Sequence, residues 1–527
     1  MRLVVIGSGP AGVAAAKALA EAGHPVTLLD AGREIEPGRM ETFDALARSE
    51  PAQWSQGDAD RVRGTFPVGI KSVGLKPAYG SLFPYAVEDA DLRVIREGAE
   101  TLPSLARGGL SNAWGASMLP FKASDIGDWP VSVGDLEPHY EAVLRFVPLA
   151  GERDELGAIF PLYTEPHSLQ RCAQAEMVMS RLRRNAAALR ERGFSFGASR
   201  LALLAAQEDR RHCRYAGLCL YGCPYGSIYS SAQTLTQLIA DGAVDYRPGL
   251  YVDRLAEQRE GVRIDFHALG QPKAGGEMLA SRVFVACGCV SSTRLMLESM
   301  GRGPAAHRLM DSQYFMVPLV TPRAAHVGVA TQGNTLAQVF LELEDRSVSA
   351  HTVHLQIYTF NDLMLAALAA RLPLSQATLE RALQPLFGRL LVAQGYFHSS
   401  ESPGIALHLE PGRLRLVGES GAADVSRVVR RIAKAGHLLG MFPIPGLVQL
   451  GSPGKSNHVG GSFPMRRTPG DLESDVLGRP GGFDRVHVVD SSVFPSVPAT
   501  TVTLTVMANA HRIAAAVGRA DPAVGCP

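Results

Sequence analysis

The stretch RLVVIGSGPAGVAAAKALAEAGHPVTLLD, residues 2–30, decides the fold. Its opening run of apolar, mostly β-branched residues predicts a buried parallel strand. The Ala-rich segment that follows predicts a helix that ends at Gly23. A second apolar run then closes on Asp30 and predicts the next strand. Strand, glycine turn, helix and strand in this order predict a Rossmann-like α/β unit.

The turn GSGPAG within this unit predicts a dinucleotide site. Gly7 permits the tight turn, Gly9 lets the backbone approach a pyrophosphate, and Gly12 lets the helix pack on the strand. The carboxylate of Asp30 can accept hydrogen bonds from a ribose diol. The alternative is a glycine turn without a ligand. The motif does not itself distinguish FAD from NAD, but its place at residue 7 and the lack of a second such unit are typical of flavoproteins.

Length and composition limit the remaining choices. A chain of 527 residues favours two domains. A net charge of +1 gives no reason to expect nucleic acid or an anionic membrane as a partner. The N-terminus lacks the features of a signal peptide, and no apolar run reaches the roughly 18 residues of a spanning helix. We therefore expect a cytoplasmic protein without a membrane span.

Two further stretches supply ligand-binding features. The segment GGLSNAWG, residues 108–115, combines glycines for close backbone approach with polar and aromatic side chains: Gly108, Gly109, Ser111, Asn112 and Trp114. The segment HVVDSSVFPSVPATTVTLTVMANAHRIA, residues 487–514, predicts a strand, a loop and a helix. The N-terminus of that helix points free N–H groups and a positive dipole end at an electron-rich ligand.

Taken together, these motifs resemble the glucose–methanol–choline (GMC) family of flavoprotein oxidoreductases. The resemblance rests on GSGPAG, GGLSNAWG, VFVACGCVSSTRLMLES (283–299), HVGGSFPM (458–465) and the C-terminal segment. Among the branches of the family, GGLSNAWGA followed by DWPVSVGDLEPHYEAV is most similar to the pyranose-oxidase-like, sugar-oxidising branch. Residues 311–450 match nothing, and they lie where the family places its substrate domain.

The resemblance implies an α/β fold in two discontinuous parts. A Rossmann-like FAD-binding domain with a parallel sheet is expected from residues 1–125, 200–310 and 455–527. A substrate-binding or cap domain, with an antiparallel sheet flanked by helices, is expected from residues 126–199 and 311–454.

The resemblance also extends the set of residues expected to contact FAD. This set comprises Gly7, Gly9, Pro10, Ala11, Gly12, Asp30, Ala31, Gly108, Gly109, Ser111, Asn112, Trp114, Gly115, Val252, Ala286, Gly288, Asp490, Ser491, Val502 and Thr503. Some sugar oxidases of the family link FAD through a histidine that aligns with Ala113. Alanine cannot form that bond, so we expect FAD to be bound noncovalently.

His458 is the expected catalytic base. The segment from His458 to Met465 fits the family motif H-x-x-G-[ST]-x-x-M. An imidazole, with an ordinary pKa of about 6.5, is suited to take the proton of an alcohol while flavin N5 accepts the hydride. The family places Asn or His as its partner, where this chain has Thr501. A hydroxyl donates one hydrogen bond and is no base at neutral pH, so either His458 acts alone or its partner comes from elsewhere.

These observations predict an FAD-dependent oxidoreductase that oxidises an alcohol, in particular a sugar or sugar-like compound. The substrate is then a small-molecule alcohol, and the electrons pass to oxygen or to an external acceptor. Three alternatives stay open. They are a redox-neutral, lyase-type flavoenzyme, which Thr501 favours, a dehydrogenase of long-chain or lipid-like alcohols, and a flavin-binding scaffold without catalysis. The sequence does not determine the oligomeric state.

Three closely spaced cysteines form a separate motif. Cys213, Cys219 and Cys223 are spaced C-x5-C-x3-C-P, which resembles the cluster-bearing subunits of bacterial sugar dehydrogenases of this family. Two interpretations stay open: an iron–sulfur cluster on these thiolates, or a loop of inert or disulfide-paired thiols.

The middle of the chain is harder to interpret. Residues 326–360 read as strands, and residues 361–397 read as two helices broken at Pro373. The apolar residues of these helices predict a core position, or else a lid that faces lipid or a partner. The histidines of this region, His351, His354 and His398, show no metal-ligand spacing and suggest no role.

Overall fold

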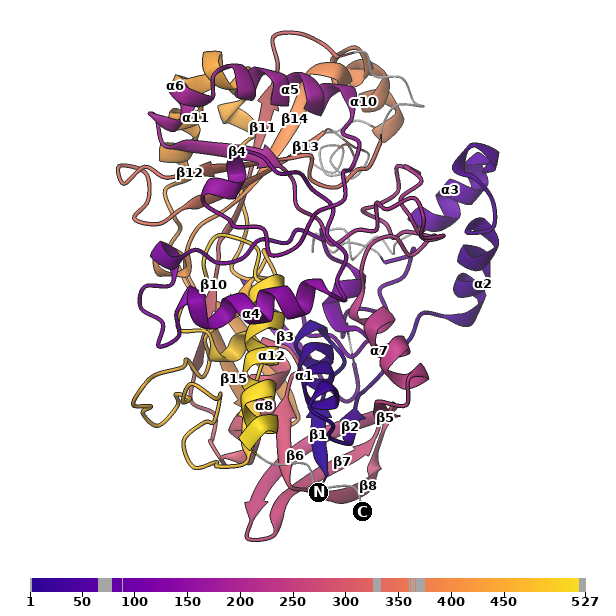
Figure 1. The fold of residues 1–527 in the computed structure, drawn as a ribbon, viewed down its shortest axis with the longest axis vertical. Helices are drawn as coiled ribbons and strands as arrows, with labels where there is room; N and C mark the ends of the chain where they lie inside the picture. The colour runs from indigo at the N-terminus through magenta and orange to yellow at the C-terminus, as the bar shows by residue number, and fades with distance from the viewer. Residues whose placement is uncertain are drawn as a thin grey trace.

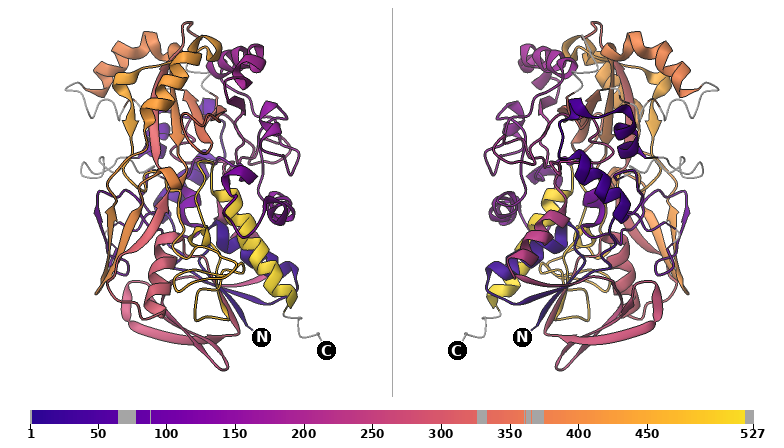
Figure 2. Two further views of the ribbon diagram at one scale, coloured as in Figure 1. Left: turned by 90° about the vertical axis from the view of Figure 1, so that its left-hand side faces the viewer. Right: turned by 90° about the vertical axis from the view of Figure 1, so that its right-hand side faces the viewer.

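The computed structural model describes residues 2–64, 78–87, 89–325, 333–359, 361, 365 and 375–520. The molecule is elongated, with the N-terminal strand and the end of the described chain in its lower part (Figure 1). The side views show helices α5 (Ala173–Arg184) and α11 (Val425–Leu439) at the top of the molecule and α12 (Thr503–Ala520) in its lower part (Figure 2). These two parts carry the two main sheets.

The lower part is built on a five-stranded parallel sheet of order β20-β9-β1-β2-β5. Its strands are β1 (Leu3–Ile6), β2 (Val26–Leu29), β5 (Val244–Arg247), β9 (Arg282–Val285) and β20 (Val486–Val488). Every pairing is parallel, and β1 and β2 are fully buried. The strand, helix and strand predicted for residues 2–30 are therefore confirmed, and the sheet joins them to the C-terminal strand.

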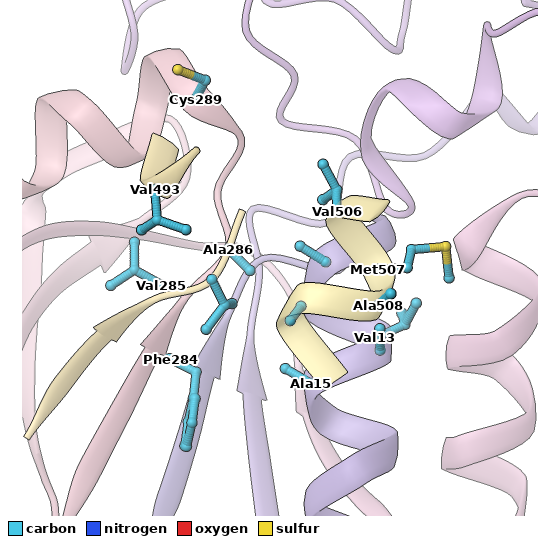
Figure 3. Packing of buried hydrophobic residues seen from close by; sticks show 14 of the residues in the cluster. Val13, Ala15, Phe284, Val285, Ala286, Cys289, Val493, Val506, Met507 and Ala508 are labelled. Carbon is cyan, nitrogen blue, oxygen red and sulfur yellow. The ribbon is translucent and has the colours of Figure 1, made fainter. Parts of the chain in front are cut away.

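Two helices from opposite ends of the chain pack against each other beside this sheet. They are α1 (Pro10–Glu21) and α12, and their contact is built from small side chains such as Ala15 and Ala508 beside Val13 and Met507 (Figure 3). Small residues let the two backbones approach closely, which explains the Ala-rich sequence. Helix α4 (Val133–Leu144) packs on the other side of α12, although the predicted boundary at residue 126 would place it in the substrate domain.

Two smaller antiparallel or mixed sheets complete the lower part and the middle. A three-stranded sheet contains β6 (Leu250–Gln258), β7 (Gly261–Ala268) and β8 (Gln271–Ala280). A five-stranded sheet has the order β19-β10-β15-β16-β3, with strands β3 (Val94–Glu97), β10 (His307–Asp311), β15 (Ile405–Glu410), β16 (Arg413–Gly418) and β19 (Val459–Gly460). Helix α8 (Cys289–Ser299) contacts β6, and α7 (Ser231–Ala240) contacts α1.

The upper part is built on a seven-stranded antiparallel sheet. Its order is β17-β11-β14-β13-β12-β4, and β18 also pairs with β11. The strands are β4 (Phe194–Ala198), β11 (Tyr314–Val320), β12 (Val339–Leu343), β13 (Val353–Thr359), β14 (Leu390–Tyr396), β17 (Phe442–Pro443) and β18 (Gln449–Leu450). Helices α5, α6 (Ala186–Arg190) and α11 cover one face through a separate apolar core. The predicted fold class, a parallel Rossmann-like sheet with a second antiparallel sheet flanked by helices, is confirmed.

The remaining helices lie at the margins. They are α2 (Pro37–Leu46), α3 (Gln56–Arg63) and α10 (Gln376–Leu383). Helices α2 and α3 stand beside the main body on the right of Figure 1. In the described part of the chain, no helix is long and apolar enough to cross a membrane.

One prediction for the middle of the chain is wrong. The segment 390–396, read as the end of a helix, is strand β14. This strand lies in the interior of its sheet and is buried on both faces, so it lacks the alternation that usually marks a strand. Of the two helices predicted before it, the second is present as α10 (Gln376–Leu383). The first helix and the break at Pro373 lie largely outside the described residues.

Candidate active site

A cleft opens at the carboxyl ends of the parallel strands. Its walls include the residues that directly follow β1, β2 and β9, where doubly wound sheets bind ligands. Its empty volume, open solvent included, is about 1270 Å³. Its lining also includes the segment 286–291 and Thr503 at the start of α12.

Most of the residues expected to contact FAD line this cleft. These are Gly7, Gly9, Pro10, Ala11, Asp30, Ala31, Gly109, Val252, Ala286, Gly288, Asp490, Ser491, Val502 and Thr503. Six others do not line it, namely Gly12, Gly108, Ser111, Asn112, Trp114 and Gly115. Segments from both ends and the middle of the chain thus meet at one place.

The glycines of the first turn form a backbone cradle for an anionic group. A Cβ on Gly7 would lie 2.5 Å from the Ala286 carbonyl oxygen, and one on Gly12 would lie 1.9 Å from the Gly7 carbonyl oxygen. A Cβ on Gly9 would meet no heavy atom within 4 Å, because this position faces the cleft. The space beside Gly9 and the start of α1 suits a pyrophosphate, so the residues present fit FAD.

Asp30 lies at the end of β2 and is held by two hydroxyl donors. The Ser8 hydroxyl donates to Asp30 Oδ2, and the Tyr246 hydroxyl donates to the same oxygen at 3.1 Å. Burial raises the pKa of Asp30 to about 6, against the opposing effect of these hydrogen bonds. Ser8 Oγ also accepts the Gly108 amide at 2.9 Å. Gly108 therefore holds Ser8, which lines the cleft, but does not line the cleft itself.

Asp490 joins the start of helix α8 to the short 3-10 turn that follows β20. Its Oδ2 accepts the Gly288 amide at 2.9 Å, and its Oδ1 accepts the Ser492 amide at 3.0 Å. Burial raises the pKa of the Asp490 carboxyl. Helix α8 begins beside Gly288, and Thr503 begins α12, so the N–H groups of both helices border the cleft.

The polar residues of the 108–115 segment brace its turn. Ser111 Oγ donates to the Gly108 carbonyl oxygen at 2.6 Å, and Asn112 Nδ2 donates to the Gly109 carbonyl oxygen at 2.8 Å. Trp114 Nε1 donates to the Tyr229 carbonyl oxygen at 2.8 Å. These side chains therefore stabilise the backbone beside the cleft and do not line the cleft themselves.

His458 lies at the edge of the cleft, just before β19. Its neighbours Asn457 and Val459 line the cleft, although His458 itself does not. The His458 amide donates to Ser456 Oγ at 2.8 Å, and that hydroxyl donates to Asp311 Oδ1 at 2.8 Å. These two bonds fix the backbone that presents the imidazole.

The environment of His458 suits a neutral base. Burial, with a smaller contribution from the nearby His354, lowers the pKa of His458 to about 3. The imidazole is therefore uncharged at neutral pH. Within the described residues its buried Nδ1 has no hydrogen-bond partner. A neutral imidazole with a free ring nitrogen can form a hydrogen bond with a ligand hydroxyl.

Thr501 is turned into the protein. Its Oγ1 accepts the Leu119 amide at 3.0 Å, and the residue is 3% exposed. It does not line the cleft, although Val502 and Thr503 do. The hydroxyl thus tethers the loop before α12 to the segment that follows Trp114.

The structure adds residues near His458 that the sequence did not identify. The Tyr396 ring stacks on the His458 ring at 4.8 Å between centroids. His354, Glu342 and Gln356 lie on the same face of the seven-stranded sheet as Tyr396. The signal was the alternation VHLQIYT at residues 353–359, in which every second residue is polar or carries a hydroxyl.

The three cysteines do not form a metal site in this structure. Among the described residues, no group of three or more His, Cys, Asp or Glu side chains is placed to hold a metal ion. Cys213, Cys219 and Cys223 are free thiols, and burial followed by the charge of Cys219 raises the pKa of Cys213 to about 12. The predicted iron–sulfur cluster therefore has no support in the described part of the chain.

Comparisons with known proteins agree with this picture at the level of the fold. Residues 1–53 match the pyridine nucleotide-disulphide oxidoreductase family. An L-glutamate oxidase precursor from Streptomyces viridosporus is 32% identical over 98 residues, which cover 17% of this chain and 15% of that protein. The chain thus matches only a small share of the length of this curated relative.

Two solved structures match along almost the whole chain. Pyridoxine 4-oxidase from Mesorbium loti is similar over 97% of this chain and 98% of its own, with a TM-score of 0.59 and 16% identity. A formate oxidase variant from Aspergillus oryzae, studied for the modification of its FAD, is similar over 97% of both chains, with a TM-score of 0.60 and 13% identity. The chain therefore shares the two-part α/β fold of these oxidases.

Proposed function

We propose that the chain is an FAD-dependent oxidoreductase of the GMC type that acts on CH–OH groups. The observation that carries the proposal is the position of a neutral histidine, His458, at the edge of a cleft whose glycine cradle suits a dinucleotide. The cleft alone would suit any dinucleotide-binding protein. The base beside it makes an oxidation of alcohols the best-supported reaction.

Each wall of the cleft has a task in this proposal. The cradle around Gly9 holds the pyrophosphate, and the Asp30 carboxylate accepts the ribose hydroxyls. The N–H groups at the start of α12 stabilise negative charge near the redox centre. Bound FAD supplies the acceptor for the hydride. His458 takes the hydroxyl proton of the substrate, and its tether through Ser456 and Asp311 keeps it in place.

The substrate class is a finer proposal. A sugar or sugar-like alcohol is supported by the resemblance of residues 106–143 to the sugar-oxidising branch of the family. The named activity of one structural neighbour, pyridoxine oxidation, adds an aromatic alcohol to the compounds worth testing.

The fate of the electrons is the second finer proposal. Both solved structures of similar fold are oxidases by name, so oxygen is the first acceptor to test. An external acceptor is the alternative, and the cytoplasmic location also stays a prediction. Consumption of oxygen during turnover, compared with reduction of an artificial dye under nitrogen, separates the two acceptors.

Anaerobic mixing with a panel of alcohols tests the function. We expect the flavin absorbance near 450 nm to bleach with at least one sugar, glycoside, aromatic alcohol or long-chain alcohol. A flavin that stays oxidised with the whole panel would contradict the proposal.

The mode of flavin attachment has its own test. Because Ala113 cannot link the cofactor, acid precipitation should release intact FAD into the supernatant. Yellow colour that stays with the protein pellet would contradict noncovalent binding.

A redox-neutral, lyase-type reaction is the second candidate. Thr501 favours it. Its hydroxyl is bound to the Leu119 amide, so the loop has no equivalent of the usual partner of the catalytic histidine. Carbon–carbon cleavage products formed while the flavin stays oxidised would select this candidate. A flavin-binding scaffold without catalysis is disfavoured by His458 in its complete motif.

A further inference from the structure

The loop before α12, where the partner of His458 is expected, carries only Thr501 at that position. Thr501 Oγ1 already accepts the Leu119 amide, and a hydroxyl has a single proton to donate. Yet a proton taken up by a buried imidazole creates a charge that is costly without a polar partner. The compensating group must therefore come from another part of the molecule.

The seven-stranded sheet carries a polar face that reaches His458 through Tyr396. His354 and Gln356 on β13 point to one face, while the residues between them point into the apolar core beneath α5 and α11. In the sheet register, His354 pairs with Glu342 of β12 on one side and with Tyr396 of β14 on the other. Three neighbouring strands thus contribute one residue each to a single cluster.

The hydrogen bonds of this cluster have one consistent direction. His354 Nδ1 lies 2.7 Å from Glu342 Oε1, and a carboxylate can only accept, so Nδ1 carries the proton. His354 Nε2 then accepts from the Gln356 amide at 3.2 Å, and Gln356 Oε1 accepts the Tyr358 hydroxyl at 2.9 Å. The side chains of Glu342 and His354 are both 0% exposed.

Tyr396 connects this cluster to His458. Its ring lies 4.8 Å from the His458 ring with planes 25° apart, and 6.0 Å from the His354 ring with planes 23° apart. On the other side, the buried Arg200 guanidinium interacts electrostatically with Glu342. Buried ionic groups of this kind add little net stability, so the packing of the sheet does not account for them.

We infer that the Glu342–His354 pair is the polar partner of His458 and replaces the side chain that the family carries at position 501. The inference rests on the proposed function. The hydroxyl proton of the alcohol passes to the His458 imidazole, and the hydride with its two electrons passes to FAD. The pair forms no bond with the substrate. It positions His458 through the Tyr396 ring and supplies a fixed carboxylate charge for the imidazolium that forms.

The first test does not depend on turnover. Histidine ring ¹⁵N resonances of the FAD-loaded protein report the tautomer and charge of His458, which is assigned by its loss in His458→Gln. We expect Glu342→Gln to shift the His458 resonances, and His24→Gln to leave them in place. His24 is a matched control, since its buried imidazole bonds to the Gly518 carbonyl oxygen far from the cleft. Unshifted resonances in Glu342→Gln would overturn the inference.

The second test uses the alcohol that bleaches the wild-type flavin. We expect Glu342→Gln and His354→Gln to bind FAD normally and to slow flavin reduction by about tenfold or more, the scale of a lost charged hydrogen bond. Adding Thr501→Asn to His354→Gln restores the partner of the family and should recover part of the rate, which a purely structural role would not allow. An unslowed rate, or no recovery, would overturn the inference.

Two features keep these tests decisive. If the single variants fail to fold, the double variant Glu342→Met/His354→Leu removes the pair without leaving an unpaired buried charge, and it should show the same loss and the same recovery with Thr501→Asn. If no alcohol reduces the wild-type flavin, the proposed function fails, while the ¹⁵N resonances still decide whether the pair acts on His458.

Discussion

The cofactor cleft and the face of the seven-stranded sheet are built in different ways. The cleft relies on backbone features, with glycines at its turns and N–H groups at its helix ends. The sheet face is made of side chains that alternate along β12, β13 and β14 and meet only through register. A site made of backbone needs a specific local sequence, whereas a site made of side chains on paired strands does not.

Because of this difference, single substitutions should act differently in the cleft and on the sheet face. Backbone cradles fail when a Cβ enters them, and side-chain sites fail when a functional group is removed. We therefore expect substitutions in the cleft to change the affinity for FAD. Substitutions on the sheet face or at His458 should change the rate of flavin reduction.

The largest effect is expected from His458→Ala. Loss of a general base slows flavin reduction by about 10²-fold or more, while FAD stays bound because His458 does not line the cleft. Stopped-flow absorbance under nitrogen measures the rate, and His24→Gln serves as the control. A wild-type rate in His458→Ala would show that His458 is not the catalytic base.

A substitution in the cradle should act on affinity. Gly9→Val has room for its Cβ in the folded chain, but its methyl groups enter the cleft where the pyrophosphate binds. We expect an unchanged unfolding midpoint of the apoprotein and an affinity for FAD lowered by about tenfold or more, the scale of one lost charge-assisted contact. Flavin fluorescence titration measures it, and Gly38→Ala, at an exposed position with open space, is the control. Tight binding by Gly9→Val would refute the cradle.

Asp30 should make FAD binding depend on pH. Because burial raises its pKa to about 6, the carboxylate that accepts the ribose hydroxyls is formed above that pH and is lost as the pH falls through it. The affinity should therefore fall a few-fold between about pH 7.5 and pH 5. In Asp30→Asn the affinity should be weaker at the higher pH and nearly flat. An equally steep pH dependence in Asp30→Asn would assign the effect to another group.

The smallest effect is expected from Thr501→Ala. Its hydroxyl accepts one backbone amide, and a single neutral hydrogen bond is worth about 0.5–1.5 kcal/mol. Flavin reduction should slow much less than in His458→Ala, with a slight loss of thermal stability. A loss as large as that of His458→Ala would make Thr501 a full partner and would argue against the role of His354.

The cofactor-binding part of the fold could be predicted from the sequence alone. Strand, glycine turn, helix and acid within residues 2–30 specify a Rossmann-like unit because each element needs those residue types for its own backbone geometry. His458 was visible for a similar reason, since its motif carries the glycines that shape the loop around it. These features are local, so they can be recognised without knowing what packs against them.

The remaining features depend on contacts between distant parts of the chain. Strand β14 is buried on both faces and reads like a helix in sequence, and His354 reads as an isolated histidine until its strand is paired with β12 and β14. The inward position of Thr501 was equally hidden. Contacts between distant strands depend on register and packing, which no short stretch of sequence contains.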